Sequence, residues 1–180
     1  MVSGLIILIL AYGVYVGVRR GLVMQMVYTT GYAISLAIAI MNCRWLGSKL
    51  DLLVPYPSAS PRSYFAFFST KVSLSLDQAF YCGVAFVFIL FVGWMITRII
   101  GAYLHDLTFY PLPADLNHVS GALLAFICNY AAIFFVLYVL ALIPISGLQK
   151  SLNNSLIAST MIRYSIFLTR PFTQLLLAIP

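Results

Sequence analysis

The sequence predicts an all-α membrane protein: a four-helix transmembrane bundle followed by a C-terminal amphipathic interfacial helix. Of the 180 residues, 63% are apolar and only 8% are charged, and the mean hydropathy is +1.03. A soluble domain is about 25% charged, so these few charges cannot cover a water-facing surface. Four apolar stretches of nearly bilayer-crossing length follow one another. The last 36 or so residues instead mix apolar and polar side chains at helical spacing.

The predicted transmembrane domain comprises residues 1–144. The N-terminal stretch has no basic residue ahead of it, so we interpret it as a retained span rather than a signal peptide. It is closed by Arg19, Arg20 and Gly21, and the second span follows at once, which predicts a tight antiparallel hairpin. The four predicted spans cover about residues 2–18, 22–41, 79–100 and 119–143.

Two segments outside the spans are predicted to lie at the membrane surface. Residues 42–78 form a connection in which three prolines exclude one continuous helix, and the aromatic cluster at 64–68 is typical of the headgroup level. Residues 145–180 form a tail whose polar side includes Arg163 and Arg170, as expected of a basic amphipathic helix or helix pair. The alternative, a fifth span, would bury both arginines.

Two arguments about orientation disagree. The first span usually dominates insertion, and two arginines follow it directly, which places the turn in the cytoplasm and both termini outside. The total count of basic residues favours the opposite arrangement. We give more weight to the charges of the turn, because the two spans are joined directly and no long loop separates these charges from the membrane. The basic residues that this topology leaves outside are Arg44, Lys49, Arg62, Lys71, Lys150, Arg163 and Arg170.

Small residues spaced four apart on every span predict close helix packing. Such residues let two helix backbones approach and gain dispersion contacts within lipid. An alternative is that Gly and Ala are simply common in membrane helices. The residues that we expect at the helix contacts are Gly13, Gly17, Gly31, Gly93, Gly121 and Asn129.

Few residues suggest chemistry. No ionisable side chain falls in the middle of a predicted span, and the deepest strongly polar groups, Gln25 and Asn129, are expected to form hydrogen bonds between helices. His105-Asp106 and the 115–118 segment pair a carboxylate with an imidazole, but without a third ligand or a nucleophile we expect loop or capping roles. We therefore predict no catalytic, cofactor or metal site, and no enzyme. The scattered basic residues also argue against nucleic acid as a partner.

The order of several short motifs resembles that of the colicin V production protein (CvpA) family, and is closest to its Gram-positive, lactic-acid-bacterial branch. The resemblance implies a small bacterial inner-membrane protein linked to colicin V production or export and to envelope function. The segments that carry it are Tyr15-Val16-Gly17-Val18-Arg19-Arg20-Gly21-Leu22, Leu53-Val54-Pro55-Tyr56-Pro57-Ser58-Ala59, Phe65-Ala66-Phe67-Phe68, Leu76-Asp77-Gln78-Ala79-Phe80-Tyr81, Gly93-Trp94 and Leu140-Ala141-Leu142-Ile143-Pro144-Ile145.

The chain departs from the family pattern at charged positions. Where relatives commonly carry Asp-Arg-x-x-Gly at the start of span four, this chain has Asn117-His118-Val119-Ser120-Gly121. An Arg-Glu pair often present early in span two corresponds to Met24-Gln25. We therefore do not carry over to this chain any family mechanism that relies on those charges.

We therefore expect a multi-pass protein of the bacterial cytoplasmic (inner) membrane that acts as an accessory or scaffold in an envelope process such as peptide-toxin production. Its expected partners are membrane lipids and another membrane or envelope protein, and the sequence leaves a homo-oligomer open. The alternative is a small oligomeric channel or transporter lined by Gln25, Thr29, Thr30 and Asn129.

Overall fold

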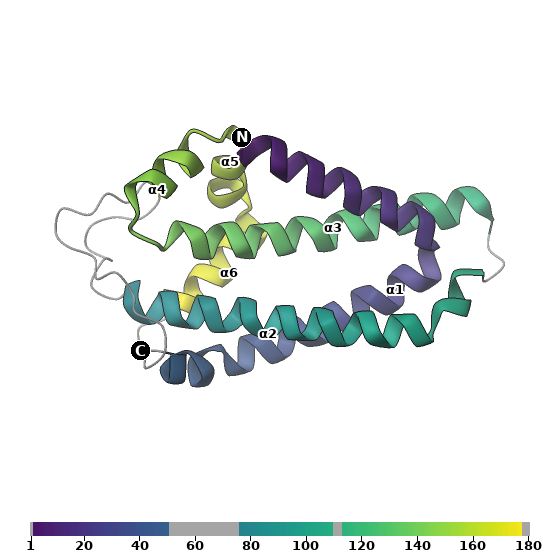
Figure 1. Ribbon diagram of the computed structural model, residues 1–180, viewed down its shortest axis with the longest axis horizontal. Coiled ribbons are helices and arrows are strands. Elements are labelled where there is room, and N and C mark those ends of the chain that lie inside the picture. Colours follow the sequence, from purple (N-terminus) through teal and green to yellow (C-terminus); the bar gives the residue numbers. More distant parts are fainter. Residues whose placement is uncertain (1, 51–75, 110–112, 178–180) are drawn as a thin grey trace.

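The computed structural model describes residues 2–50, 76–109 and 113–177, and this part of the chain is helical with short turns and no strand. This confirms the predicted all-α class. Three long helices, α1, α2 and α3, form the bundle, and three short ones follow at one end (Figure 1). The bounds are α1 (Val2–Leu50), α2 (Leu76–Tyr103), the 3₁₀ helix η2 (His105–Phe109), α3 (Ala114–Ala141), α4 (Ser146–Asn153), α5 (Leu156–Tyr164) and α6 (Ile166–Leu177).

Helix α1 turns back on itself at Gly21. This residue has φ 74° and ψ 176°, a conformation open almost only to glycine. The turn divides α1 into a first arm, residues 2–20, and a second arm, residues 22–50, which leave the turn in diverging directions towards the other end of the bundle (Figure 1). Among the described residues, α1, α2 and α3 are the helices long and apolar enough to cross a membrane. Because α1 folds back at Gly21, these three helices provide four long segments, whereas the sequence predicts four separate spans.

The second arm is longer than the sequence indicates. We expected it to end near Met41, where polar residues begin, but the helix continues to Leu50. Its polar side chains are accommodated locally, since Asn42 donates a hydrogen bond to the carbonyl oxygen of Ile38, one turn back. The inner face also stays buried, because Cys43 packs against Cys82 of α2. Residues 51–75 of the predicted connection, including its prolines and the aromatic cluster at 64–68, lie outside the described residues, and α2 already begins at Leu76.

The first arm packs closely against α3. A Cβ atom added at Gly13 would overlap the side chain of Asn129. One added at Gly17 would overlap both Ala125 and the backbone of Gly121. These small residues therefore bring the first arm and α3 into backbone contact near the turn, as expected for helices that associate within lipid.

The second arm packs against α2 through a reciprocal pair of contacts. A Cβ atom at Gly31 would overlap Thr97 of α2, and one at Gly93 of α2 would overlap Ser35. Each hydroxyl donates to the glycine carbonyl of its own helix, Ser35 to Gly31 at 2.8 Å and Thr97 to Gly93 at 2.7 Å. Both polar side chains are thus buried and satisfied, and α2 and α3 meet mainly through α1 rather than through each other.

The tail forms three short helices instead of one helix or a helix pair. Each described tail helix has a buried face, and Phe172 of α6 packs between Phe86 and Phe135 with ring centroids 4.8 and 4.9 Å away. The hydroxyl oxygen of Ser155, the residue before α5, lies 2.8 Å from the hydroxyl oxygen of Ser3 at the start of the first arm, within hydrogen-bond distance. Arg163 and Arg170 are exposed on the outer side. The tail therefore covers the end of the bundle opposite the Gly21 turn.

Candidate functional site

The turn at Gly21 is held by two adjacent residues of α3. The side-chain oxygen of Asn117 accepts a hydrogen bond from the backbone N–H of Leu22 at 2.6 Å, which satisfies a donor that the start of a helix leaves unpaired. Nδ1 of His118 lies 2.9 Å from the carbonyl oxygen of Val18 at the end of the first arm. A carbonyl can only accept, so the imidazole carries its proton on Nδ1 in this arrangement. Both arms are therefore capped from a neighbouring helix.

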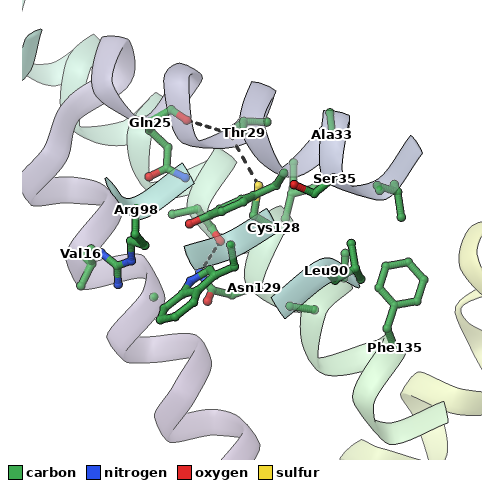
Figure 2. A pocket seen from close by; sticks show the side chains of 18 of the residues that line it. Val16, Gln25, Thr29, Ala33, Ser35, Leu90, Arg98, Cys128, Asn129 and Phe135 are labelled. Carbon is green, nitrogen blue, oxygen red and sulfur yellow. Dashed lines mark hydrogen bonds between the residues drawn. The ribbon is translucent and has the colours of Figure 1, made fainter. Parts of the chain in front are cut away.

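A cavity of about 330 Å³ lies between the two arms, α2 and α3 (Figure 2). We call it the central pocket. Its walls combine apolar side chains with a small set of polar ones, as ligand sites do. The residues that line it are Tyr12, Gly13, Val16, Arg20, Gln25, Thr29, Tyr32, Ala33, Ser35, Leu36, Leu90, Trp94, Arg98, Ala125, Ile127, Cys128, Asn129, Ala131, Ala132 and Phe135.

Two arginines from different helices share one tyrosine at the turn end of the central pocket. The guanidinium carbon of Arg20 lies 4.1 Å from the ring centroid of Tyr28, and that of Arg98 lies 5.8 Å from the same centroid. Arg98 also lies 5.3 Å from the ring centroid of Trp94. Cation–π contacts stabilise a cation without neutralising it. Within the described ranges neither arginine forms an ion pair with a carboxylate, so both charges are available to an anion.

Deeper in the pocket, polar groups of the second arm and α3 face one another (Figure 2). The hydroxyl of Thr29 donates to the carbonyl oxygen of Gln25 at 2.8 Å and lies 3.6 Å from the sulfur of Cys128. Asn129 donates to the carbonyl oxygen of Ala125 at 2.7 Å. Gln25 is only 2% exposed, and its side-chain oxygen has no hydrogen-bond partner among the described residues. A buried acceptor without a donor is costly, so Gln25 is a candidate contact for a ligand.

Comparison with known proteins decides the family. The model of the family described as colicin V production protein matches residues 2–165, which is nearly the whole chain. The chain belongs to the colicin V production protein family. It is also 25% identical over 169 residues to the uncharacterized transmembrane protein YshB of Bacillus subtilis (strain 168), covering 94% of this chain and 93% of the relative. No solved structure matches the chain.

Membership of the colicin V production protein family gives the Asn117-His118 departure a structural meaning. Relatives with Asp-Arg at these positions would offer an acceptor and a donor in the same order, since Asp accepts hydrogen bonds and Arg donates them. Here Asn117 accepts from Leu22 and His118 faces the carbonyl oxygen of Val18. In this chain Asn117 and His118 thus supply the acceptor and the donor that cap the turn.

The structure brings together some residues that the sequence singled out and leaves others apart. Gln25, Thr29 and Asn129 all line the central pocket, whereas Thr30 is exposed and does not. Gly13 also lines the pocket, while Gly17, Gly31, Gly93 and Gly121 lie at helix contacts outside it. Arg19 is exposed, with Tyr15 as its hydrogen-bond partner, and Arg163 and Arg170 belong to the opposite end.

The pairing of Arg20 with Arg98 is the feature that sequence reasoning missed in this family member. We interpreted Arg20 as part of a topology signal, and Arg98, close to the end of the third predicted span, as lying outside the middle of the membrane. Both interpretations treat each arginine alone, but the Gly21 turn places Arg20 over the ring of Tyr28, which Arg98 also approaches. The available signal is the aromatic one turn before Arg98, at Trp94. The described residues include no group of three or more metal-ligating side chains.

Proposed function

We propose that this member of the colicin V production protein family is an accessory protein of the bacterial cytoplasmic membrane that acts by binding rather than by catalysis. It takes up a ligand from the lipid phase in the central pocket and serves an envelope process of the peptide-toxin-production type, together with another membrane or envelope protein. Its Arg19-Arg20 turn faces the cytoplasm, and both termini face outward. Nucleic acid plays no part.

The observation that carries this proposal is the composition of the central pocket. It combines two arginines that have no carboxylate partner among the described residues with a buried Gln25 oxygen that lacks a donor. Guanidinium groups that face a pocket and have no carboxylate partner are suited to bind an anion through paired hydrogen bonds. The pocket offers no nucleophile held by a general base, which is the arrangement that an acyl- or phosphoryl-transfer enzyme needs. Binding is the chemistry that these groups support.

Complementation with a pocket-filling variant tests the proposal. Ala33 lines the pocket, and Ala37, one turn further along the second arm, does not, yet both are exposed. In a strain that lacks the chromosomal gene, Ala37→Trp should restore toxin production or envelope integrity, whereas Ala33→Trp should not, at equal amounts of membrane-inserted protein. Full restoration by Ala33→Trp would exclude a function for the pocket.

A second candidate, a small oligomeric transporter, is favoured by one observation: Gln25, Thr29 and Asn129 gather in a single cavity. A transporter would move its solute through that cavity. Purified protein in liposomes separates the two candidates. Selective flux that Ala33→Trp abolishes favours transport, while crosslinking of a native partner without flux favours the accessory role.

A further inference from the structure

We propose that the ligand of the central pocket is an anionic amphiphile, with its phosphate-type head at Arg20 and Arg98 and its hydrocarbon chain running past Phe135 into a second, apolar cavity beneath α6. This inference rests on the proposed binding function and specifies the class of ligand. It is carried by the charges of the pocket, by the unpartnered Gln25 oxygen and by the apolar cavity that adjoins them.

The turn end of the pocket selects for an anion. Two guanidinium groups that face the same Tyr28 ring repel each other, and an anion between them converts that repulsion into attraction. Guanidinium groups match phosphate oxygens through paired hydrogen bonds, and these strengthen where lipid excludes water. A zwitterionic head would bring its own cation towards the two arginines and bind less well.

Gln25 adds a requirement for a donor. Its side-chain oxygen is buried and has no donor among the described residues, and Figure 2 shows the amide directed into the pocket on the Arg98 side. An anion alone cannot satisfy an acceptor. A head group with a hydroxyl or an N–H, such as the P–OH of a monoprotonated phosphate monoester, supplies that donor.

The apolar cavity accounts for a hydrocarbon chain. It has a volume of about 420 Å³ and shares Leu36 and Phe135 with the central pocket, so the two adjoin. Its other walls include Phe86 of α2 and Phe172 of α6, and charged residues are absent from its lining. Along the second arm, the central pocket extends from Gln25 to Leu36, about 16 Å at 1.5 Å per residue. A head and a long chain fit end to end.

The rim of the central pocket supplies a route from the membrane. Tyr12 is 63% exposed and Ile127 is 54% exposed, although both line the pocket. In a bundle whose outer surface faces lipid, side chains that are both exposed and pocket-lining indicate an opening towards lipid. An amphiphile can therefore enter sideways, with its head remaining near the interface beside the Gly21 turn.

Fluorescence of Trp94 provides a direct test. The chain has two tryptophans, so Trp45→Phe leaves Trp94, which lines the pocket, as the reporter. The probes are hexadecyl phosphate, its zwitterionic analogue hexadecylphosphocholine, the short-chain butyl phosphate and inorganic phosphate, each titrated into the protein in uncharged detergent. We expect a saturable change of the Trp94 signal with hexadecyl phosphate at a concentration at least roughly tenfold lower than with any other probe.

Arginine variants supply the matched control. Arg19 and Arg20 are adjacent and carry the same charge, but only Arg20 lines the pocket. Arg20→Gln should weaken hexadecyl phosphate binding roughly tenfold, the equivalent of one charge-assisted hydrogen bond, and Arg19→Gln should not. Arg98→Lys keeps the charge without the paired donors and should weaken binding less than Arg98→Gln, in proteins whose ligand-free melting temperatures match the parent.

The outcomes separate this inference from the proposed function. Equal binding of hexadecylphosphocholine, or equal weakening by Arg19→Gln, overturns the anionic head while leaving a lipid-binding pocket. Equal binding of inorganic or butyl phosphate overturns the amphiphile in favour of a soluble anion. If no probe of any charge changes the Trp94 signal, both the inference and the pocket-binding function are wrong.

Discussion

Asn117 of α3 accepts a hydrogen bond, at 2.6 Å, from the backbone N–H of Leu22, the first residue after the glycine that folds α1 in two. The two residues are 95 positions apart in the sequence. The reversal of α1 is therefore completed by a helix made later in the chain. Because the same turn places Arg20 against Tyr28, the shape of the central pocket depends on this contact.

Removing the Asn117 side-chain acceptor should destabilise the bundle. We expect Asn117→Ala to lower the free energy of unfolding by about 1 kcal/mol, the usual cost of losing a helix N-cap. Asn117→Asp retains the acceptor and should stay close to the parent protein. Thermal unfolding in detergent measures both variants. Asn42→Ala is the control, because exposed Asn42 bonds only within its own helix. If Asn42→Ala and Asn117→Ala lower the free energy of unfolding equally, the hydrogen bond from Asn117 to the turn adds no stability to the bundle.

The conformation of Gly21 predicts a larger effect. A side chain at φ 74° and ψ 176° is strained, and one at this site would also overlap Asn117. We expect Gly21→Ala to lower the free energy of unfolding by about 1 to 3 kcal/mol. Gly147→Ala serves as the control, since a Cβ there would meet nothing within 4 Å. Equal melting temperatures for the two variants would contradict the folded turn.

The tail should contribute to stability through Phe172. This ring is 4% exposed and packs in a cluster of aromatic rings contributed by α2 and α3. Phe172→Ala should lower the free energy of unfolding by about 3 to 5 kcal/mol, as expected when a buried phenylalanine is removed. Phe88→Ala, at a ring that is 55% exposed on α2, should change the melting temperature little. A tail that only rests on the membrane would give two variants of similar stability.

Orientation should depend on the arginine pair at the turn. Basic residues are retained on the cytoplasmic side during insertion. Neutral replacements of both Arg19 and Arg20 should therefore give a mixture of orientations, which C-terminal reporter fusions can quantify. In the unmodified protein the reporter should lie outside. A cytoplasmic reporter in the unmodified protein would reverse the proposed topology.

Much of the fold was predictable from local patterns, whereas the site was not. Apolar length predicts the long helices, and Gly21 directly after two arginines predicts the hairpin. The extension to Leu50 was missed because polar Asn42 and Arg44 suggest a loop, while burial of Cys43 against α2 is a tertiary effect. The pocket was missed for a similar reason. Arg20 and Arg98 are far apart in sequence and meet only because the turn and α2 bring them to one tyrosine.

The reactivity of Cys128 directly measures whether the central pocket takes up an anionic amphiphile from the membrane. With Cys43→Ala and Cys82→Ala, Cys128 on the pocket wall is the remaining thiol of the chain. The measurement is its rate of modification by N-ethylmaleimide in phosphatidylcholine vesicles, with and without hexadecyl phosphate. A cysteine introduced at Leu123, which is 60% exposed on α3 and outside the pocket, is the control when Cys128 is also replaced by alanine. We expect hexadecyl phosphate to slow modification of Cys128, to leave the control unchanged and to need a roughly tenfold higher concentration in Arg20→Gln. An unchanged rate for Cys128 at saturating hexadecyl phosphate would contradict this expectation.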